Sequence, residues 1–452
     1  MRLFGPIVHH TMPTVMARAT SVSSKNQPMT ATLLHRAGTA VRAGTVVVLA
    51  LLAAGCATVA PEIAPPPVAP PPVVAPPTPP PAPPPAPSLP ASYRPAVFAA
   101  LPGWNDDRVQ DAWPAFRVGC AALVKPAAPA RALWSPACAA ADAVDASDPA
   151  AVRAFFLAHF SPYEVVAADG RTDGMVTGYY EPLLAGSRTK TARFAVPLYA
   201  APDDLLTIDL TALYPELKDK RLRGRVDGRT VVPYWTRADI ANGKAPVDGK
   251  ALVYVEDPIE AFFLEIQGSG RVKLADGSVM RVGYADQNGH PYRSIARVLI
   301  DRGDVTLDRA SMQGIREWGR RHPEQLPALL AENPSYVFFR EVPAPEPGSL
   351  EARIDGPIGT LGVPLLAGRA IAVDARSIPL GAPVFLATTY PLSTRPLQRL
   401  VLAQDTGGAI RGAIRADFFW GFGDDAGREA GRMKQDGRMW ILWPKDAGPP
   451  RP

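Results

Sequence analysis

Two aspartates on either side of a glycine-rich loop are the residues of this chain best suited to acid–base chemistry. They lie in R-L-V-L-A-Q-D-T-G-G-A-I-R-G-A-I-R-A-D-F-F-W-G, residues 399–421, where the apolar run 400–403 predicts a strand that delivers Asp405 to its end. Three aromatic residues, 418–420, follow Asp417. A carboxyl group among aromatic side chains loses hydration, which raises its pKa and lets it hold a proton near neutrality, as a general acid must. The alternative is that both aspartates cap loops, a common role for Asp beside Gly.

A third aspartate, Asp374, stands in G-R-A-I-A-V-D-A-R-S-I-P-L-G, residues 368–381, where another strand runs into a turn. Upstream lie G-Y-Y-E-P (178–182), F-F-L-E-I-Q-G-S-G-R (262–271) and Y-A-D-Q-N-G-H-P-Y-R-S-I (284–295). In this order, and with A-Q-D-T-G-G-A-I-R-G and A-D-F-F-W-G, these segments resemble the membrane-bound lytic murein transglycosylase A family and its three-aspartate domain. The resemblance extends over residues 101–445.

This resemblance implies a lyase that cleaves the β-1,4 bond between N-acetylmuramic acid and N-acetylglucosamine in peptidoglycan without consuming water. Asp417 matches the catalytic aspartate of the family, so it is expected to protonate the leaving oxygen and then to accept the proton of the muramoyl C6 hydroxyl. The product is a 1,6-anhydromuramoyl end. Asp405 is expected to orient Asp417 or a sugar hydroxyl and to raise the pKa of Asp417 by its charge. The resemblance implies no cofactor and no metal ion.

The matched segments also supply residues expected to bind the glycan. Aromatic rings would stack on sugar faces, although aromatic residues in strands belong to cores as often. The Q-G-S-G-R turn offers hydrogen-bonding groups for N-acetyl or lactyl substituents. His290 is expected to be structural, because the mechanism gives it no role. The expected substrate-binding residues are Tyr179, Tyr180, Glu181, Gln267, Ser269, Arg271, Asn288, Trp420 and Asp374. For Asp374, which is further away in sequence, holding a turn is an equal alternative.

The elements that must position these residues fall into a helical part and a strand-rich part. Residues 104–159 show helical spacing, with one helix expected over 149–160 after an Asp148 N-cap. Cys120 and Cys138 lie in this part and predict a disulfide in an oxidising compartment, with two buried thiols as the alternative. Short strands are expected from Met175 on, among them 175–180, 193–199, 251–255, 262–267 and 277–282. Helices are expected over 294–302, 308–322 and 327–332 before strands resume.

The predicted fold class is mainly β with a helical N-terminal segment. Strand spacing indicates a barrel or a sandwich, and the resemblance implies a double-psi β-barrel with a smaller β domain inserted. The expected boundaries are 1–55 for a signal region, 56–93 for a lipobox and proline-rich tether, 94–186 for the first part of the barrel, 187–345 for the insert, 346–446 for the three-aspartate part and 447–452 for a tail.

The N-terminal region resembles the signal of a bacterial lipoprotein. A short apolar run, 45–52, follows basic residues and leads to A-A-G-C. Cys56 is the expected site of lipidation, although Ala53 stands where the lipobox usually has Leu; the alternative is an ordinary signal peptide. Translation starting at Met16 or Met29 would give the signal a more usual length. Because Ala57 rather than Asp follows the cysteine, the anchor is expected at the periplasmic face of the outer membrane of a Gram-negative bacterium.

A proline-rich segment, 57–90, separates this cysteine from the rest of the chain. In polyproline II form it would reach roughly 100 Å, enough to let an anchored enzyme search a polymer layer. A recognition ligand for an aromatic groove is the alternative for this segment.

Charge and motifs limit the other function classes. A net charge of +5 over 452 residues is too small to indicate nucleic-acid binding, but it suits an anionic polymer such as the cell wall. D-T-G at Asp405 is typical of aspartic proteases, which need two such aspartates, and the sequence has one D-T-G. The absence of H-E-x-x-H argues against a zinc peptidase. A hydrolytic muramidase and a non-catalytic wall-binding protein stay open as alternatives. The chain is expected to be a monomer, with the cell-wall synthesis machinery as a further partner.

Overall fold

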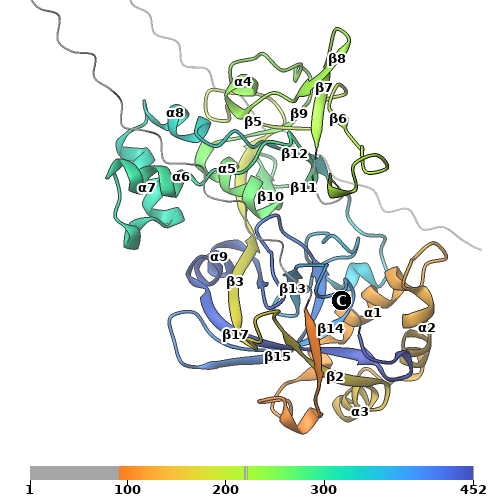
Figure 1. The fold of residues 1–452 in the computed structure, drawn as a ribbon. Helices are drawn as coiled ribbons and strands as arrows, with labels where there is room; N and C mark the ends of the chain where they lie inside the picture. Colours follow the sequence, from red (N-terminus) through yellow and green to blue (C-terminus); the bar gives the residue numbers. More distant parts are fainter. Residues whose placement is uncertain (1–90, 218–219, 221, 451–452) are drawn as a thin grey trace, which may run out of the picture. The chain divides into compact units, whose positions relative to one another are not determined.

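The computed structural model describes residues 91–217, 220 and 222–450, so the predictions for the signal region, Cys56 and the proline-rich segment lie outside the described residues. The helices are α1 (Trp113–Leu123), α2 (Arg131–Ala140), α3 (Pro149–His159), α4 (Arg237–Ala241), α5 (Pro258–Gln267), α6 (Ile295–Arg302), α7 (Met312–Arg321), α8 (Leu326–Ala331) and α9 (Gly423–Arg432) (Figure 1). In the described part of the chain, no helix has the length and apolar character needed to cross a membrane.

Six strands form a closed β-barrel. The sheet has the order β1 (Ser92–Pro95), β2 (Phe160–Val166), β17 (Lys434–Pro444), β14 (Pro383–Thr389), β15 (Pro396–Asp405), β13 (Ala370–Val373), β16 (Ala416–Phe422) and β3 (Gly174–Glu181). Strand β17 also pairs with β3, which joins the two ends of the row from β17 to β3. Two neighbouring pairs, β13 with β15 and β16 with β3, are parallel.

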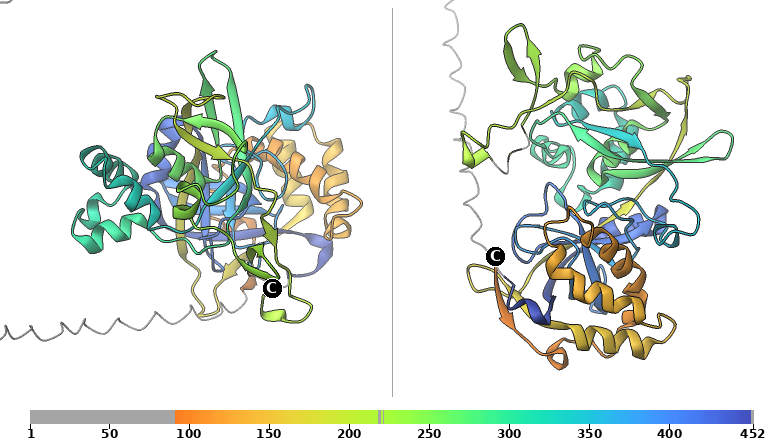
Figure 2. Two further views of the ribbon diagram at one scale, coloured as in Figure 1. Left: turned by 90° about the horizontal axis from the view of Figure 1, so that it is seen from above. Right: turned by 90° about the vertical axis from the view of Figure 1, so that its right-hand side faces the viewer.

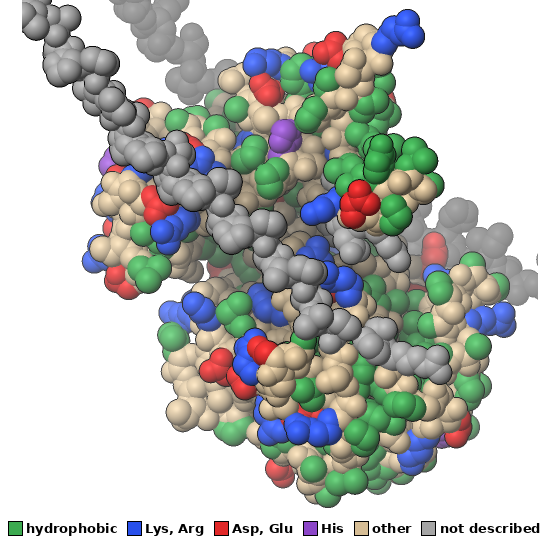
Figure 3. All heavy atoms as spheres, in the orientation of Figure 1, with side chains coloured by type: hydrophobic (Ala, Val, Ile, Leu, Met, Phe, Trp, Pro, Cys, Tyr) green, Lys and Arg blue, Asp and Glu red, His purple; other side chains and the backbone are tan. Residues whose placement is uncertain are grey.

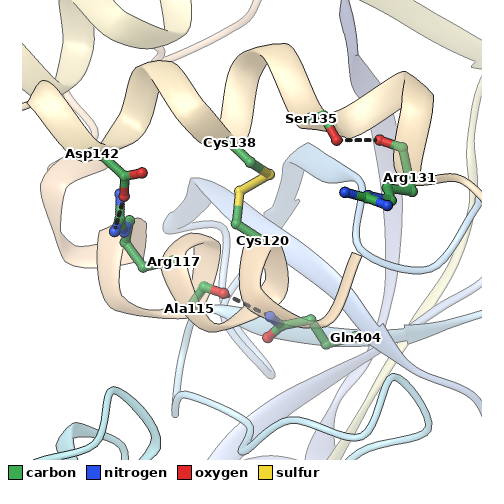
Figure 4. Close-up of a disulfide and its surroundings, with 8 residues drawn as sticks. All are labelled: Ala115, Arg117, Cys120, Arg131, Ser135, Cys138, Asp142 and Gln404. Atoms are coloured by element: carbon green, nitrogen blue, oxygen red, sulfur yellow. Dashed lines mark hydrogen bonds and ion pairs between the residues drawn. A yellow bond between two sulfur atoms is a disulfide. The ribbon is translucent and has the colours of Figure 1, made fainter. Parts of the chain in front are cut away.

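The apolar interior of this barrel continues into helices α1 to α3. Strand β13 is buried at every position, as expected for a strand covered on both faces. The three helices lie together beside the C-terminal strands (Figure 2), and their aromatic side chains belong to the same core as the barrel residues. Helix α3 begins after Asp148, whose side chain accepts the N–H of Ala150 as an N-cap, as the sequence predicts. The predicted disulfide between Cys120 and Cys138 is present and joins α1 to α2 (Figure 4).

A second sheet follows β3 directly. Its order is β12 (Val337–Glu341), β11 (Val279–Gln287), β10 (Ser269–Leu274), β4 (Leu183–Ser187), β9 (Ala251–Val255) and β5 (Val196–Tyr199). A third, small sheet contains β6 (Leu206–Thr207), β7 (Arg223–Asp227) and β8 (Thr230–Pro233). Helices α5 to α8 share a separate apolar cluster built around Phe262, Leu299 and Trp318. The six-stranded sheet has its own apolar cluster, distinct from that of the barrel.

A network of charged side chains connects the six-stranded sheet to the end of β3. The Arg271 guanidinium donates to Glu181 at 2.8 Å and to both carboxylate oxygens of Asp355 at 2.8 and 2.9 Å. Arg281 donates to Asp355 at 3.2 Å and to the Gly356 carbonyl at 2.7 Å. Since Glu181 is buried, these charge-assisted bonds offset part of its lost hydration, and the pKa of Glu181 stays above its ordinary value because burial outweighs them.

The prediction of a strand over residues 262–267 is wrong, because these residues form the second half of helix α5. Asp257 caps the helix by accepting the N–H groups of Ile259 and Glu260, and Pro258 occupies the first turn. Gly268 ends it with a φ of +79°, a left-handed conformation that glycine adopts without strain. The apolar run F-F-L-E-I is too short for its period to separate a buried strand from a buried helix. The helices expected near 294–302, 308–322 and 327–332 correspond to α6, α7 and α8.

Candidate active site

Strand β13 aligns the two aspartates. Ala372 pairs with Asp405 on β15 at one side and with Asp417 on β16 at the other. Neighbouring strands are about 4.8 Å apart, so the backbones of the two aspartates are separated by about 10 Å. Residues in register on adjacent strands point to the same face of a sheet. The topology therefore places the side chains of Asp405 and Asp417 on one face.

A β-bulge gives Asp405 this orientation. The pairing of β13 with β15 shifts by one residue immediately before Ala372, which makes Gln404 the extra residue. Gln404 is fully buried, and its Nε2 donates to the carbonyl oxygen of Ala115 in α1 at 2.7 Å (Figure 4). Without the bulge, Gln404 would stand opposite Ala372 and Asp405 would point to the other face, because side chains alternate along a strand.

Asp417 is held through one of its two carboxylate oxygens. The hydroxyl of Thr177, its neighbour on β3, donates to Asp417 Oδ1 at 2.5 Å. Among the residues that the structure describes, no protein group is bonded to Asp417 Oδ2. Burial raises the pKa of Asp417 above its ordinary value; the Thr177 bond and the charge of Arg415 lower it, and the charge of Asp405 raises it again. The net direction is upward, as a group that carries a proton near neutrality requires.

Asp405 is held through both of its oxygens. Oδ1 accepts from the backbone N–H and the hydroxyl of Thr360 at 3.0 and 2.9 Å, and Oδ2 accepts from the Tyr179 hydroxyl at 3.1 Å. Burial raises the pKa of Asp405, and these hydrogen bonds lower it. Thr177 and Tyr179 stand two residues apart on β3, so they share one face and each serves one aspartate.

Both aspartates line a cleft of about 990 Å³. This volume is at the upper end of the range for small-molecule sites, so the cleft has room for more than one sugar ring. Its walls include Gly178 of β3, the loop residue Thr360, and residues of α5, β11 and β12. Two of its tyrosines, Tyr284 and Tyr292, keep 38% and 55% of their surface exposed.

On the face seen in Figure 3, Lys and Arg side chains are interspersed with Asp and Glu side chains rather than gathered in one patch.

Four of the expected binding residues line this cleft: Tyr179, Glu181, Gln267 and Ser269. Tyr179 packs against Phe419 at 5.1 Å between ring centroids, and its hydroxyl is bonded to Asp405. Glu181 is held by Arg271. The Gln267 side chain accepts the backbone N–H of Tyr180 at 3.1 Å.

Asp374 is not among the residues that line the cleft, and its contacts support the turn-holding role that was expected alongside substrate contact. It is 2% exposed and accepts two bonds from the Arg376 guanidinium at 2.9 and 2.7 Å. It also accepts the backbone N–H of Gly412 at 2.8 Å. Asp374 therefore holds the loop between Asp405 and Asp417 in place.

Four further residues expected to bind sugar also lie outside the cleft lining, because each is engaged in structural contacts. Tyr180 is buried against α9, and its hydroxyl lies 3.8 Å from the Met312 sulfur. Arg271 is occupied by the charged network described above. Asn288 is 1% exposed and donates to the carbonyl oxygens of Trp235 and Pro334. The Trp420 indole N–H points to the Met433 sulfur at 3.3 Å.

Of the residues that hold the aspartates, Tyr179 is a candidate from the sequence, whereas Thr177 and Thr360 are not. Thr177 and Tyr179 are two residues apart in β3, so their side chains lie on the same face of the sheet. Because Tyr179 is a candidate from the sequence, this spacing could have identified Thr177. Thr360 lies outside every helix and strand, and no pattern pointed to it. Among the described residues, no group of three or more His, Cys, Asp and Glu side chains is arranged to hold a metal ion.

Comparisons with known proteins place the chain in a family. The family described as "MltA specific insert domain" matches residues 175–340, and the "3D domain" family matches residues 369–443. The membrane-bound lytic murein transglycosylase A of Escherichia coli K12 is 34% identical over 288 residues, 62% of this chain and 68% of that protein. The crystal structure of MltA from Neisseria gonorrhoeae is similar with a TM-score of 0.68 and 38% identity, covering 80% of this chain and 93% of that one. E. coli MltA with bound chitohexaose gives a TM-score of 0.55 at 26% identity, covering 79% and 92%. By sequence and by fold, the chain belongs to the membrane-bound lytic murein transglycosylase A family.

Proposed function

We propose that Asp417 is the single acid–base group of a peptidoglycan lytic transglycosylase. Asp417 lines the cleft and has a raised pKa, and its Oδ2 is free of protein partners in the described part of the chain. That oxygen is the observation on which the proposal rests. A general acid must reach the leaving oxygen directly, so one carboxylate oxygen has to stay open to the substrate.

Asp417 donates one proton in the first step of the reaction and regains a proton in the second. Asp417 Oδ2 gives its proton to the oxygen that links muramoyl C1 to the next N-acetylglucosamine, and the C1–O bond breaks. The resulting carboxylate accepts the proton of the muramoyl C6 hydroxyl while O6 attacks C1. A 1,6-anhydromuramoyl end forms, a new hydroxyl end is released, and Asp417 is protonated again. Burial keeps the pKa of Asp417 high, and the charge of Asp405 adds to this effect, so both support the first step.

The other carboxylates of the cleft are occupied, which favours ring closure over hydrolysis. Glu181 and Glu265 are paired with Arg271 and Arg237 at 2.8 and 2.7 Å. Asp405 accepts protein hydrogen bonds on both oxygens. A second carboxylate to activate water is therefore missing from the described residues around the cleft. A well-placed intramolecular hydroxyl acts at an effective concentration of roughly 10⁵ M or more, against about 55 M for water.

Mass spectrometry of the muropeptides that the purified protein releases from sacculi tests this proposal. The expected products are one water lighter than reducing ends, and Asp417→Asn should release none while melting at the wild-type temperature. Reducing ends would indicate a hydrolase. A folded and fully active Asp417→Asn variant would remove Asp417 from the mechanism.

The glycan strand is proposed to lie along the cleft. The relative that was crystallised with chitohexaose supports a saccharide ligand in this family. Tyr284 and Tyr292 line the cleft with partly exposed rings, so they are better placed than Tyr180 and Trp420 to stack on sugars. Gln267 and Ser269 remain proposed polar contacts. Tyr292→Ala should raise KM for sacculi with little change in kcat, and an unchanged KM would exclude that ring from substrate binding.

The barrel is proposed to be of the double-psi type, interrupted by an insert over residues 187–345 between barrel parts 94–186 and 346–446. The closed ring of six strands with its two parallel pairs supports this assignment. The chain is further proposed to act as a monomer at the periplasmic face of the outer membrane, anchored through lipidated Cys56 and working beside the cell-wall synthesis machinery. The name of the E. coli relative supports membrane attachment. An unmodified Cys56 in mass spectra of the N-terminal peptide would contradict it.

A further inference from the structure

A chain of two hydrogen bonds ends on the proposed acid. Arg415 Nη2 donates to Thr177 Oγ1 at 2.8 Å, and Thr177 Oγ1 donates to Asp417 Oδ1 at 2.5 Å. The same guanidinium is fixed by its other nitrogen, Nη1, which donates to the carbonyl oxygens of Ala416 and Met175 at 2.5 and 3.3 Å. Arg415 and Thr177 are both half-buried, so water competes little for these bonds.

The direction of this chain follows from the chemistry of its members. A guanidinium carries donors and no acceptor, so the bond between Arg415 and Thr177 uses a lone pair of the threonine oxygen. A hydroxyl has one hydrogen, and the hydrogen of Thr177 is then directed to Asp417. Oδ1 of Asp417 must accept this bond. A protonated Asp417 consequently carries its proton on Oδ2.

We propose that Arg415 and Thr177 are positioning residues that place the catalytic proton on Oδ2 of Asp417 and keep it there through both steps. This inference rests on the proposed function of Asp417. Oδ1 accepts the same bond when the carboxyl group is protonated and when it is ionised. Neither the threonine nor the carboxyl group has to rotate between donating a proton to the glycosidic oxygen and accepting one from the C6 hydroxyl.

The pair also adjusts the acidity of Asp417. Burial raises the pKa of Asp417, whereas the hydroxyl bond and the positive charge of Arg415 lower it. Both contributions stabilise the ionised form, which is needed to accept the second proton. Asp405 acts in the opposite direction. The charge of Asp405 therefore favours the protonated form of Asp417, whereas Arg415 and Thr177 favour its ionised form.

Three substitutions separate these roles. Thr177→Val removes the hydroxyl at nearly constant volume, Thr177→Ser keeps it, and Arg415→Met removes the charge and the donor. Matched controls are Thr230→Val on the exposed strand β8 and Arg411→Met, an exposed arginine of the same loop. For each purified full-length variant, initial rates of anhydromuropeptide release are measured against sacculus concentration over a series of pH values, together with the melting temperature.

Thr177→Val should lower kcat about 10-fold to 100-fold with KM unchanged, since correct placement of a general acid contributes on the order of 10²-fold or more. The group must be protonated to act as the acid, so its rate falls as pH rises through its pKa. Thr177→Val and Arg415→Met each remove a contribution that lowers this pKa. In both variants, the alkaline limb of the plot of rate against pH should therefore move to higher pH. Thr177→Ser should restore kcat and the wild-type limb, and both controls should match the wild type.

Two results would overturn the positioning role of Arg415 and Thr177 while leaving Asp417 as the acid. One is an alkaline limb of the pH–rate profile that does not move in Thr177→Val and Arg415→Met. The other is a Thr177→Ser variant as impaired as Thr177→Val. In either case Asp417→Asn would still be inactive. If Thr177→Val does not fold, Arg415→Met decides the question with the same readout. Activity in a folded Asp417→Asn variant would instead refute the proposed function, and the inference with it.

Discussion

Asp374 offers the sharpest test of how the fold supports the site, since the structure assigns it to holding a loop. In Asp374→Asn the side chain keeps its volume but loses its charge. The bond from the Gly412 N–H to a carboxylate contributes about 1.5–3 kcal/mol. The pair with Arg376, whose side chain is 47% exposed, contributes about 0.5–1 kcal/mol. The substitution should thus lower the free energy of unfolding by about 2–4 kcal/mol, a large share of the 5–15 kcal/mol typical of a domain.

The pH dependence of this loss follows from the pKa of Asp374. Burial raises that pKa, but the bonds from Arg376 and Gly412 outweigh burial, and the pKa in the folded protein is below its ordinary value. A depressed carboxyl pKa contributes stability that is present above the ordinary pKa and is lost as pH falls through the folded value. Wild type and Asp374→Asn should therefore differ most at neutral pH and converge in acid.

Urea unfolding of both proteins at neutral and at acid pH measures this difference, with Asp446→Asn at an exposed site as the matched control. Anhydromuropeptide release at neutral pH should also fall in Asp374→Asn, because the loop between the two site aspartates loses its anchor. Equal unfolding midpoints at neutral pH would refute the reasoning. So would a difference that stays constant down to acid pH.

The charged network and the disulfide give further predictions. Glu181→Gln should lower the free energy of unfolding by about 2 kcal/mol, because Arg271 loses a buried partner but keeps Asp355. Asp355→Asn, at a side chain 74% exposed, should cost about 1 kcal/mol or less in the same urea titration; equal losses in the two variants would contradict this ranking. Cys120→Ala opens a disulfide that spans 18 residues and should cost about 3 kcal/mol, seen as a lower melting temperature. An unchanged melting temperature would show that helix packing alone holds α1 to α2.

Sequence patterns predicted the part of the site that is local in the chain. Asp405, the glycine loop and Asp417 lie within one segment, and the strand before the loop has a clear apolar run. The bulge at Gln404 could not be predicted in this way, because it depends on which residue of β13 lies opposite. Thr177 and Thr360 were missed for the same reason: each reaches an aspartate that is far away in sequence.

Tyr180 and Trp420, which were expected to stack on sugars, pack between strands and helix α9, and this packing gives them an indirect role in the chemistry. A Cβ atom at Gly178 would lie 2.6 Å from the Trp420 ring, and one at Gly427 would lie 2.8 Å from the Tyr180 ring. These two glycines thus make room for aromatic rings between β3, β16 and α9. Because β3 carries Thr177 and β16 carries Asp417, the packing of Trp420 and Tyr180 fixes the register on which the hydrogen bond between Thr177 and Asp417 depends. Aromatic residues that the sequence suggests for sugar stacking therefore support Asp417 by holding β3 and β16 together.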